Sequence, residues 1–143
     1  MELAAAIEAE RAGAVAARAV DMPAMFSSAP DQAALTGEYA EWLAALVRSG
    51  YASGVDGAGD DWRAFAKDWG FELRDAQRVA IWHGDRDDVV DPACAPWLAA
   101  QIPNAVLQIL PDQGHISIGL ELPSIIDDLL IRAPLPDSQP RVE

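Results

Sequence analysis

Cysteine is almost absent from this sequence, since its 143 residues contain only one, Cys94. A single cysteine excludes an intrachain disulfide and any metal cluster built on several cysteines. Long hydrophobic runs are absent too, because no stretch reaches the roughly 18 apolar residues that cross a membrane. The alanine-rich start carries Glu2, Glu8 and Arg11 in a region that a secretory signal peptide would keep apolar. We therefore expect a soluble, cytoplasmic protein that does not bind membranes.

Positive charge is also scarce. The chain has 10 Lys and Arg residues against 23 Asp and Glu residues, and its formal net charge is −13. Nucleic acids and anionic membranes bind proteins through clustered positive charge, so both are poor candidates as partners. The composition is otherwise that of a folded chain, with 51% hydrophobic and 23% charged residues. This is enough apolar material for one domain with a core.

The first half of the chain is predicted to be helical. Residues 2 to about 20 favour a helix by composition, and residues 38–49 place their apolar side chains on one helical face before Gly50. Residues 60–69 form a third amphipathic pattern, after which Gly70 suits a left-handed C-terminal cap.

Loops and tryptophans complete the prediction for this half. The segments SSAPDQ (27–32) and SGYASGVDGAGD (49–60) have the composition of surface loops. Trp42, Trp62 and Trp69 lie on the apolar stripes of the predicted helices. We assign them to the core, with the lining of a substrate pocket as the alternative.

The pattern of apolar residues changes near residue 76. The pattern of the second half predicts an α/β fold. Two short apolar runs, 79–82 and 105–110, flank a predicted helix over 93–102. Strand, helix and strand within about 30 residues form a parallel crossover unit. One more amphipathic helix covers 122–130, and the proline-rich tail 133–143 is expected to fray.

Two parallel strands are too few for a stable sheet, which normally needs three or more. Two explanations remain open for this shortage. Either another chain or a second copy completes the sheet, or the 143 residues are the C-terminal portion of a larger α/β fold.

Two residues in the loops that follow the predicted strands have complementary chemistry. Asp87 comes after the first strand and His115 after the second. Reacting groups of open α/β sheets gather at the carboxyl ends of the strands, so these side chains can meet at one edge. A carboxylate that accepts the Nδ1–H of an imidazole fixes its tautomer, so that Nε2 can take a proton from a nucleophile. The pair therefore supplies an acid and a base, but no nucleophile.

At these residues the sequence resembles the α/β-hydrolase family. The runs VAIWHGDRDDVVDP (79–92) and WLAAQIPNAVLQILPDQGHISI (97–118) are similar to the C-terminal segment of such enzymes. In that family one strand leads to Gly-x-x-Asp, with the acid of the triad, and a later strand leads to Gly-His, with its base. The resemblance implies that Asp87 is the acid and His115 the base, in the family's chain order.

The resemblance also implies a division of the chain. Residues 1–57 would be a helical, cap-like region, and residues 58–132 the C-terminal hydrolase segment. Within the latter, DDWRAFAKDWGFEL (60–73) resembles the connection from the cap to the acid-bearing strand. Residues 133–143 would be a flexible tail.

The family's nucleophile is missing from the sequence. No serine has glycine at both −2 and +2, so no G-x-S-x-G elbow occurs, and the loop that forms an oxyanion hole is missing too. Cys94 stands in DPACAP without the glycines of an elbow and is not expected to replace it. The nucleophile of a complete enzyme therefore remains open among Ser, Cys and Asp.

The remaining polar residues of the strand–loop region have structural interpretations. Asp85, Asp88 and Asp91 are typical of a solvated acidic loop, with Asp91 before a proline as a helix N-cap. A calcium loop starting at Asp85 fails because valine stands where glycine is required. His83 is expected to be structural rather than a metal ligand. We predict no metal and no cofactor.

Three functional hypotheses follow. The first is a partial α/β-hydrolase that acts on an ester or related bond of a small molecule. It would be inactive alone, because another segment or chain must supply the nucleophile. The second is a non-catalytic interaction or scaffold protein derived from this fold, which forms a homodimer through its sheet edge. The third is a small binding domain that resembles the hydrolases by accident, which the two motifs in order disfavour.

Overall fold

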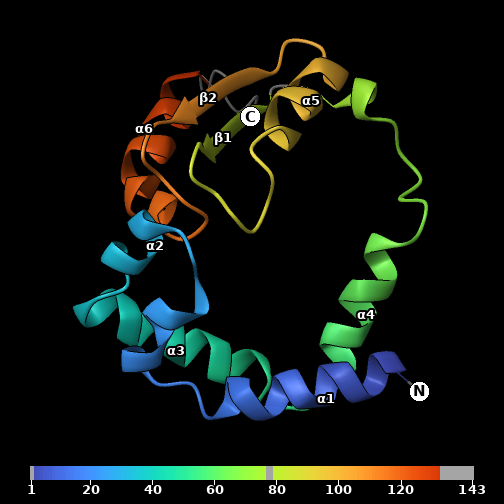
Figure 1. The fold of residues 1–143 in the computed structure, drawn as a ribbon. Coiled ribbons are helices and arrows are strands. Elements are labelled where there is room, and N and C mark those ends of the chain that lie inside the picture. The colour runs from blue at the N-terminus through green and yellow to red at the C-terminus, as the bar shows by residue number, and fades with distance from the viewer. Residues whose placement is uncertain (1, 77–78, 133–143) are drawn as a thin grey trace, which may run out of the picture. The chain divides into compact units, whose positions relative to one another are not determined.

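The computed structural model describes residues 2–76 and 79–132 (Figure 1). Its contacts divide the chain into two units, Met1–Glu72 and Leu73–Glu143. The division lies close to residue 76, where the sequence pattern changes. Residues 58–72, which the resemblance groups with the hydrolase segment, belong to the first of these two units. The tail 133–143, predicted to fray, lies outside the described residues.

The described part of the first unit is helical, as predicted. Its elements are α1 (Glu2–Val15), a 3₁₀ helix (Ala19–Met25), α2 (Ala29–Ala34), α3 (Gly37–Gly50) and α4 (Asp56–Phe65). Met22 and Leu35 are the two large apolar side chains that are fully buried, and the other core residues are mostly alanines. Arg48 of α3 adds a hydrogen bond between distant segments, because its Nη1 donates to the carbonyl of Ala17 at 2.6 Å. The core of this unit is therefore small.

Three helices of this unit differ from the prediction. The helix expected over residues 2–20 ends at Val15, where three residues separate it from the 3₁₀ helix. The segment 27–32 was predicted to be a loop, but Ala29–Ala34 forms α2. The missed signal is local, because Ser28 stands at the N-cap position with a proline in the first turn, and both favour a helix start.

The helix predicted over 60–69 is displaced towards the N-terminus. It runs from Asp56 to Phe65, so that residues predicted to be loop form its first turn. Asp56 favours this start because a carboxylate stabilises the positive end of the helix dipole. Gly70 has the expected left-handed conformation, with a φ of 72°, but it lies five residues beyond the helix and caps no helix end.

The assignment of the tryptophans to the core is wrong. Trp42, Trp62 and Trp69 are 55%, 55% and 59% exposed. Each contacts an aromatic ring of its own segment, such as Tyr39 beside Trp42 and Phe65 beside Trp62. An amphipathic stripe predicts a face that favours burial, but it does not specify a partner that covers the face.

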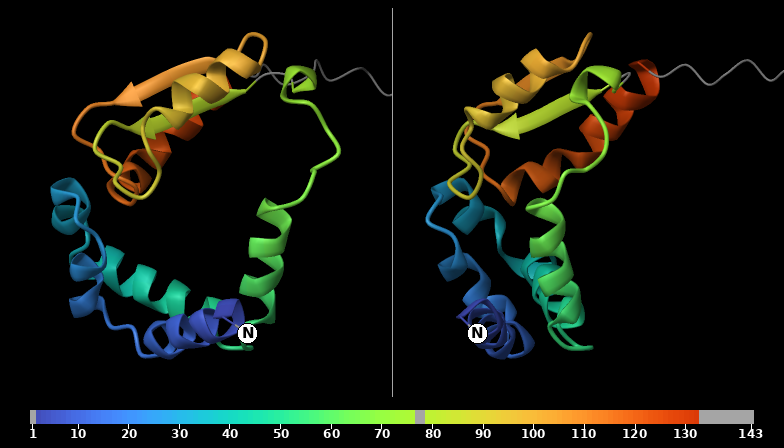
Figure 2. Two further views of the ribbon diagram at one scale, coloured as in Figure 1. Left: turned by 45° about the vertical axis from the view of Figure 1, so that its right-hand side comes forward. Right: turned by 90° about the vertical axis from the view of Figure 1, so that its right-hand side faces the viewer.

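The described part of the second unit contains the predicted strand–helix–strand unit. Strand β1 (Ala80–Gly84) and strand β2 (Val106–Leu110) pair in parallel, with Ala80 opposite Val106 and Gly84 opposite Leu110. Helix α5 (Cys94–Gln101) connects them, and α6 (Leu122–Arg132) follows. Short 3₁₀ helices occupy Leu73–Asp75 and Ser117–Glu121. Figure 2 shows α5 and α6 on opposite sides of the two strands.

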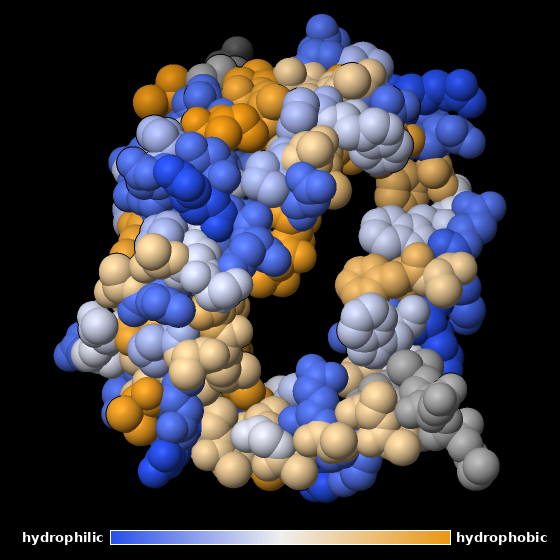
Figure 3. All heavy atoms as spheres, viewed as in Figure 1, coloured by the Kyte–Doolittle hydropathy of each residue, from blue (hydrophilic) through white to orange (hydrophobic). Residues whose placement is uncertain are grey.

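The fold class is therefore mixed α/β and mostly helical, with a sheet of two parallel strands in the described residues. Many apolar side chains remain exposed, and Figure 3 shows hydrophobic residues in orange at the surface. Those of α6 include Leu122, Ile126, Leu129 and Leu130. In the part of the chain that the structure describes, no helix combines the length and the hydropathy needed to span a bilayer.

Candidate active site

The candidate site lies at the carboxyl end of the two strands. Because β1 and β2 are parallel and Gly84 is in register with Leu110, the loops after both strands start at the same edge. The first loop carries Asp87 and the second carries His115. This is the arrangement that the sequence predicts for the two residues.

Main-chain hydrogen bonds join the two loops directly. The amide of Asp85 donates to the carbonyl of Leu110 at 3.0 Å, and the amide of Arg86 donates to the carbonyl of Gln113 at 2.8 Å. Gly84 is essential to this approach, because a Cβ at its position would overlap the carbonyl oxygen of Gln113. Glycine is thus required where the chain enters the Gly-x-x-Asp motif.

Asp85 adds a side-chain bond between the loops. Its Oδ1 accepts the amide of Asp112 at 2.7 Å, although the residue is exposed. Asp112 has a φ of 55°, a left-handed conformation that aspartate tolerates better than most residues. The prediction of a solvated turn carboxylate for Asp85 is correct in its exposure, but it missed this bond across 27 residues.

The carboxylate of Asp87 is buried, and both of its oxygens have hydrogen-bond partners. Its side chain is 5% exposed. Oδ1 accepts the amides of Val89 and Val90 at 2.9 and 2.8 Å, and Oδ2 lies 3.0 Å from Nδ1 of His115. The predicted approach of Asp87 and His115 within hydrogen-bond distance is therefore present in the structure.

The surroundings of Asp87 favour its charged form. Burial would raise the pKa of this carboxyl group, but hydrogen bonds from the Val90 amide, the His115 ring and the Val89 amide outweigh that effect. The pKa of Asp87 consequently lies below its ordinary value. At neutral pH the group is a carboxylate, as required to accept a hydrogen from imidazole.

The ring of His115 is oriented by this carboxylate. Because Asp87 is ionised, the hydrogen of the short contact must be on Nδ1, and the neutral ring then has its basic lone pair on Nε2. The side chain is 38% exposed. A buried hydrogen bond stabilises the turn around His115, because the Gly114 amide donates to the Ser117 hydroxyl at 2.7 Å. An oriented, half-exposed imidazole can exchange a proton with a reacting group.

A second histidine, His83, lies beside the same carboxylate. Its Nε2 is 3.2 Å from the carbonyl oxygen of Val90 and 3.6 Å from Oδ2 of Asp87, and its side chain is 14% exposed. The expectation that His83 has a structural role agrees with this contact. The sequence prediction nevertheless missed its place in the site, four residues before Asp87 at the end of β1.

Asp91 and Cys94, to which the sequence assigns no catalytic role, do not join this group. Asp91 does not cap α5, which begins at Cys94. Instead its Oδ1 accepts the amide of Ala93 at 2.9 Å in the preceding turn, since aspartate readily bonds the backbone two residues on. Cys94 is exposed. Among residues 2–76 and 79–132, no group of three or more His, Cys, Asp or Glu side chains is arranged to hold a metal ion.

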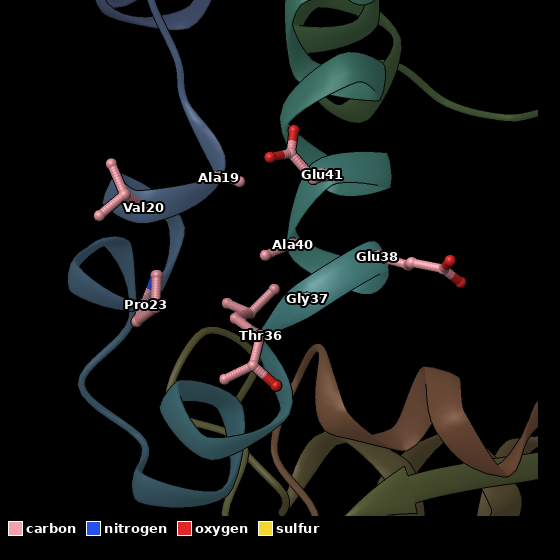
Figure 4. Close-up of a pocket in the computed structure, with 9 residues that line it drawn as sticks. Ala19, Val20, Pro23, Thr36, Gly37, Glu38, Ala40 and Glu41 are labelled. Atoms are coloured by element: carbon pink, nitrogen blue, oxygen red, sulfur yellow. The ribbon is translucent and has the colours of Figure 1, made fainter.

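The first unit contains a separate apolar hollow of about 700 Å³ (Figure 4). It lies between the 3₁₀ helix and the start of α3, with Val20, Pro23 and Leu35 among the apolar lining residues. Glu38 and Glu41 are its charged members. Neither Asp87 nor His115 is among its lining residues.

No protein-family model, curated protein or solved structure matches this chain. A function can therefore be inferred only from the residues and their geometry.

Proposed function

We propose that this chain is the acid- and base-bearing part of an α/β-hydrolase, which hydrolyses an ester or related bond of a small molecule. The observation that carries the proposal is the 3.0 Å contact between Oδ2 of Asp87 and Nδ1 of His115, at the carboxyl end of parallel strands. The buried, ionised carboxylate and the half-exposed imidazole have the two environments that these roles require.

In the proposed reaction His115 moves a proton twice. Nε2 first takes the proton of a nucleophilic hydroxyl or thiol as that group bonds to the ester carbonyl carbon. The resulting imidazolium then gives the proton to the leaving alkoxide as the ester bond breaks, and water releases the acyl group by the same two steps. Asp87 stabilises the imidazolium and does not itself take the proton.

The chain requires a nucleophile from elsewhere. No G-x-S-x-G elbow occurs in the sequence, so a further segment of the same protein or a partner chain must bring the nucleophile to His115. Ser or Cys in that role would give esterase-like chemistry. An Asp nucleophile would instead leave His115 to activate water on the ester intermediate. We expect the 143-residue chain alone to be inactive.

The second candidate function is a non-catalytic scaffold or interaction protein that associates through its sheet. The observation that favours it is the sheet of two strands, because each described strand has a neighbour on one side only. Unpaired strand edges bind further strands readily, including those of a second copy. In this case the Asp87–His115 contact would serve to hold the two loops together.

The test begins with the coding DNA upstream of the Met1 codon, read in the same frame for a nucleophile elbow. Where the frame continues into one, the extended protein is assayed with p-nitrophenyl acetate. The wild type is compared with His115→Ala and with Asp127→Asn, a control at an exposed position on α6. Loss of the general base should lower kcat by about 100- to 10,000-fold, with no change in the control. If His115→Ala were as active as the wild type, the hydrolase proposal would be overturned. A function that is retained without His115 would favour the scaffold or interaction protein.

A further inference from the structure

The residue His83 lies next to the acid–base pair and has no part in the chemistry proposed above. We infer that His83 is a positioning residue, whose Nε2–H holds the Val90 carbonyl and thereby fixes the loop that aims Asp87 at His115. The inference deepens the proposed function and rests on it, because it concerns how the acid of that same site is oriented.

The hydrogen on His83 can be assigned from its neighbours. Nε2 lies 3.2 Å from the Val90 carbonyl oxygen and 3.6 Å from Oδ2 of Asp87. Both atoms are acceptors, since the carboxylate is ionised, so Nε2 must carry the hydrogen. The distance to Val90 is that of a hydrogen bond, whereas the distance to Asp87 is too long for one. His83 therefore acts on the carboxylate through Val90.

Val90 connects the two groups because both of its backbone polar atoms are used. Its carbonyl accepts from His83, and its amide donates to Oδ1 of Asp87 at 2.8 Å. The Val89 amide donates to the same oxygen at 2.9 Å. Displacement of Val90 would therefore remove donors from Oδ1 and turn the carboxylate away from His115.

Side-chain packing cannot hold this loop by itself. Val89 and Val90 are 56% and 39% exposed, so their side chains contribute little buried area. His83, by contrast, belongs to β1 and is fixed by the ladder opposite Ile109. A side chain on a paired strand is a firmer anchor than the exposed valines, which explains why a donor at position 83 is needed.

The test uses the full chain labelled with ¹⁵N and reads its histidine rings by NMR. The sequence has two histidines, so each ring is assigned by replacing the other. His83→Phe removes the donor and keeps a ring, whereas His83→Gln places an amide donor near the position of Nε2. Circular dichroism establishes that each variant is folded.

We expect wild-type His115 to carry its hydrogen on Nδ1 and His83 to carry its own on Nε2. In His83→Phe the Nδ1–H form of His115 should be partly lost, and the Val90 amide should exchange about tenfold faster, as for one lost hydrogen bond. His83→Gln should restore both signals towards wild type. A purely structural effect would lower overall stability without this selective change at His115.

Two results would overturn the inference. One is a folded His83→Phe variant in which the His115 tautomer and Val90 exchange are unchanged. The other needs no variant, and it is a wild-type His83 ring with its hydrogen on Nδ1 rather than Nε2. Asp87→Asn separates this inference from the proposed function: if it leaves the His115 ring signals unchanged, the acid–base pair itself fails. If the His115 ring signals change in Asp87→Asn but not in His83→Phe, only the role of His83 is refuted and the acid–base pair stands.

Discussion

Oδ2 of Asp87 lies 3.0 Å from Nδ1 of His115, although 28 positions separate the two residues in the sequence. The contact forms because the two parallel strands end side by side, and because backbone bonds join the loops that follow them. The acid also accepts two amides on its other oxygen. Its environment predicts how the stability of the fold depends on pH.

The first prediction concerns the charge of Asp87. A carboxyl group with a lowered pKa in the folded state stabilises the fold above its ordinary pKa, and this contribution disappears as the pH falls through the lowered value. Asp87→Asn should therefore lower the free energy of unfolding at pH 7 by about 1–3 kcal/mol, as expected when hydrogen bonds to a charged group are lost.

Urea unfolding of the wild type and Asp87→Asn, repeated from pH 7 into the acid range, measures this difference. It should be constant near neutrality and shrink as the pH falls below 3.8, the ordinary value for the carboxyl group. A difference that grows towards acid pH would contradict the assignment of Asp87 as a stabilising carboxylate.

The second prediction concerns the close approach at Gly84. A methyl group in Gly84→Ala would overlap the Gln113 carbonyl, so the two loops must separate. We expect a loss of about 1–3 kcal/mol, typical of overpacking at a tight site. Thermal unfolding measures the loss, and faster exchange of the Arg86 amide, which donates to Gln113, locates it.

Gly57→Ala is the matched control for this substitution. Gly57 lies within α4, and a Cβ there would meet no atom within 4 Å. Because alanine favours a helix over glycine, this variant should gain up to about 1 kcal/mol. If the two variants behaved alike, the close approach at Gly84 would not be the cause of the loss.

The third prediction concerns the bond from the Asp112 amide to Asp85. In Asp85→Ala the Asp112 amide should exchange about tenfold faster, the effect of one ordinary hydrogen bond, with little change in global stability because Asp85 is exposed. Asp85→Asn keeps an Oδ1 acceptor and should behave like the wild type. Hydrogen exchange that is equal in Asp85→Ala and Asp85→Asn would show that the bond does not hold the second loop.

The sequence predicts that Asp87 and His115 meet, because local chemistry and chain order determine where the two residues lie. Short apolar runs predict both strands, and the loops that follow two parallel strands start at the same carboxyl edge. Asp87 and His115 could be identified from the sequence on these grounds. His83 could not, because its role depends on a carbonyl seven residues away that only the loop conformation brings near.

The fold of the first unit was harder to predict, for two physical reasons. Alanine-rich helices have weak apolar stripes, so composition indicated a helix near residues 2–20 without fixing where α1 ends. Segment 27–32 has the serine and proline of a loop, and the same residues also start helices. Burial of Leu35 directly after α2 is a tertiary effect that no local pattern contains.

The last prediction tests the exposure of the tryptophans. The sequence predicts that these side chains are buried, whereas the structure shows them exposed. Trp62 lies on α4 and is 55% exposed. A buried tryptophan costs about 3–5 kcal/mol when truncated to alanine, whereas an exposed surface residue changes stability by only about 0.5 kcal/mol. We therefore expect Trp62→Ala to be nearly neutral in urea unfolding of the 143-residue chain.

Met22→Ala is the positive control, because this side chain is fully buried in the first unit and its truncation should cost about 2–5 kcal/mol. Acrylamide quenching gives an independent measure, since exposed indoles are quenched more strongly than buried ones. A cost for Trp62→Ala as large as that for Met22→Ala would restore the core assignment. A cost that appears only after the proposed nucleophile-bearing segment is added would show that this segment covers the α4 face.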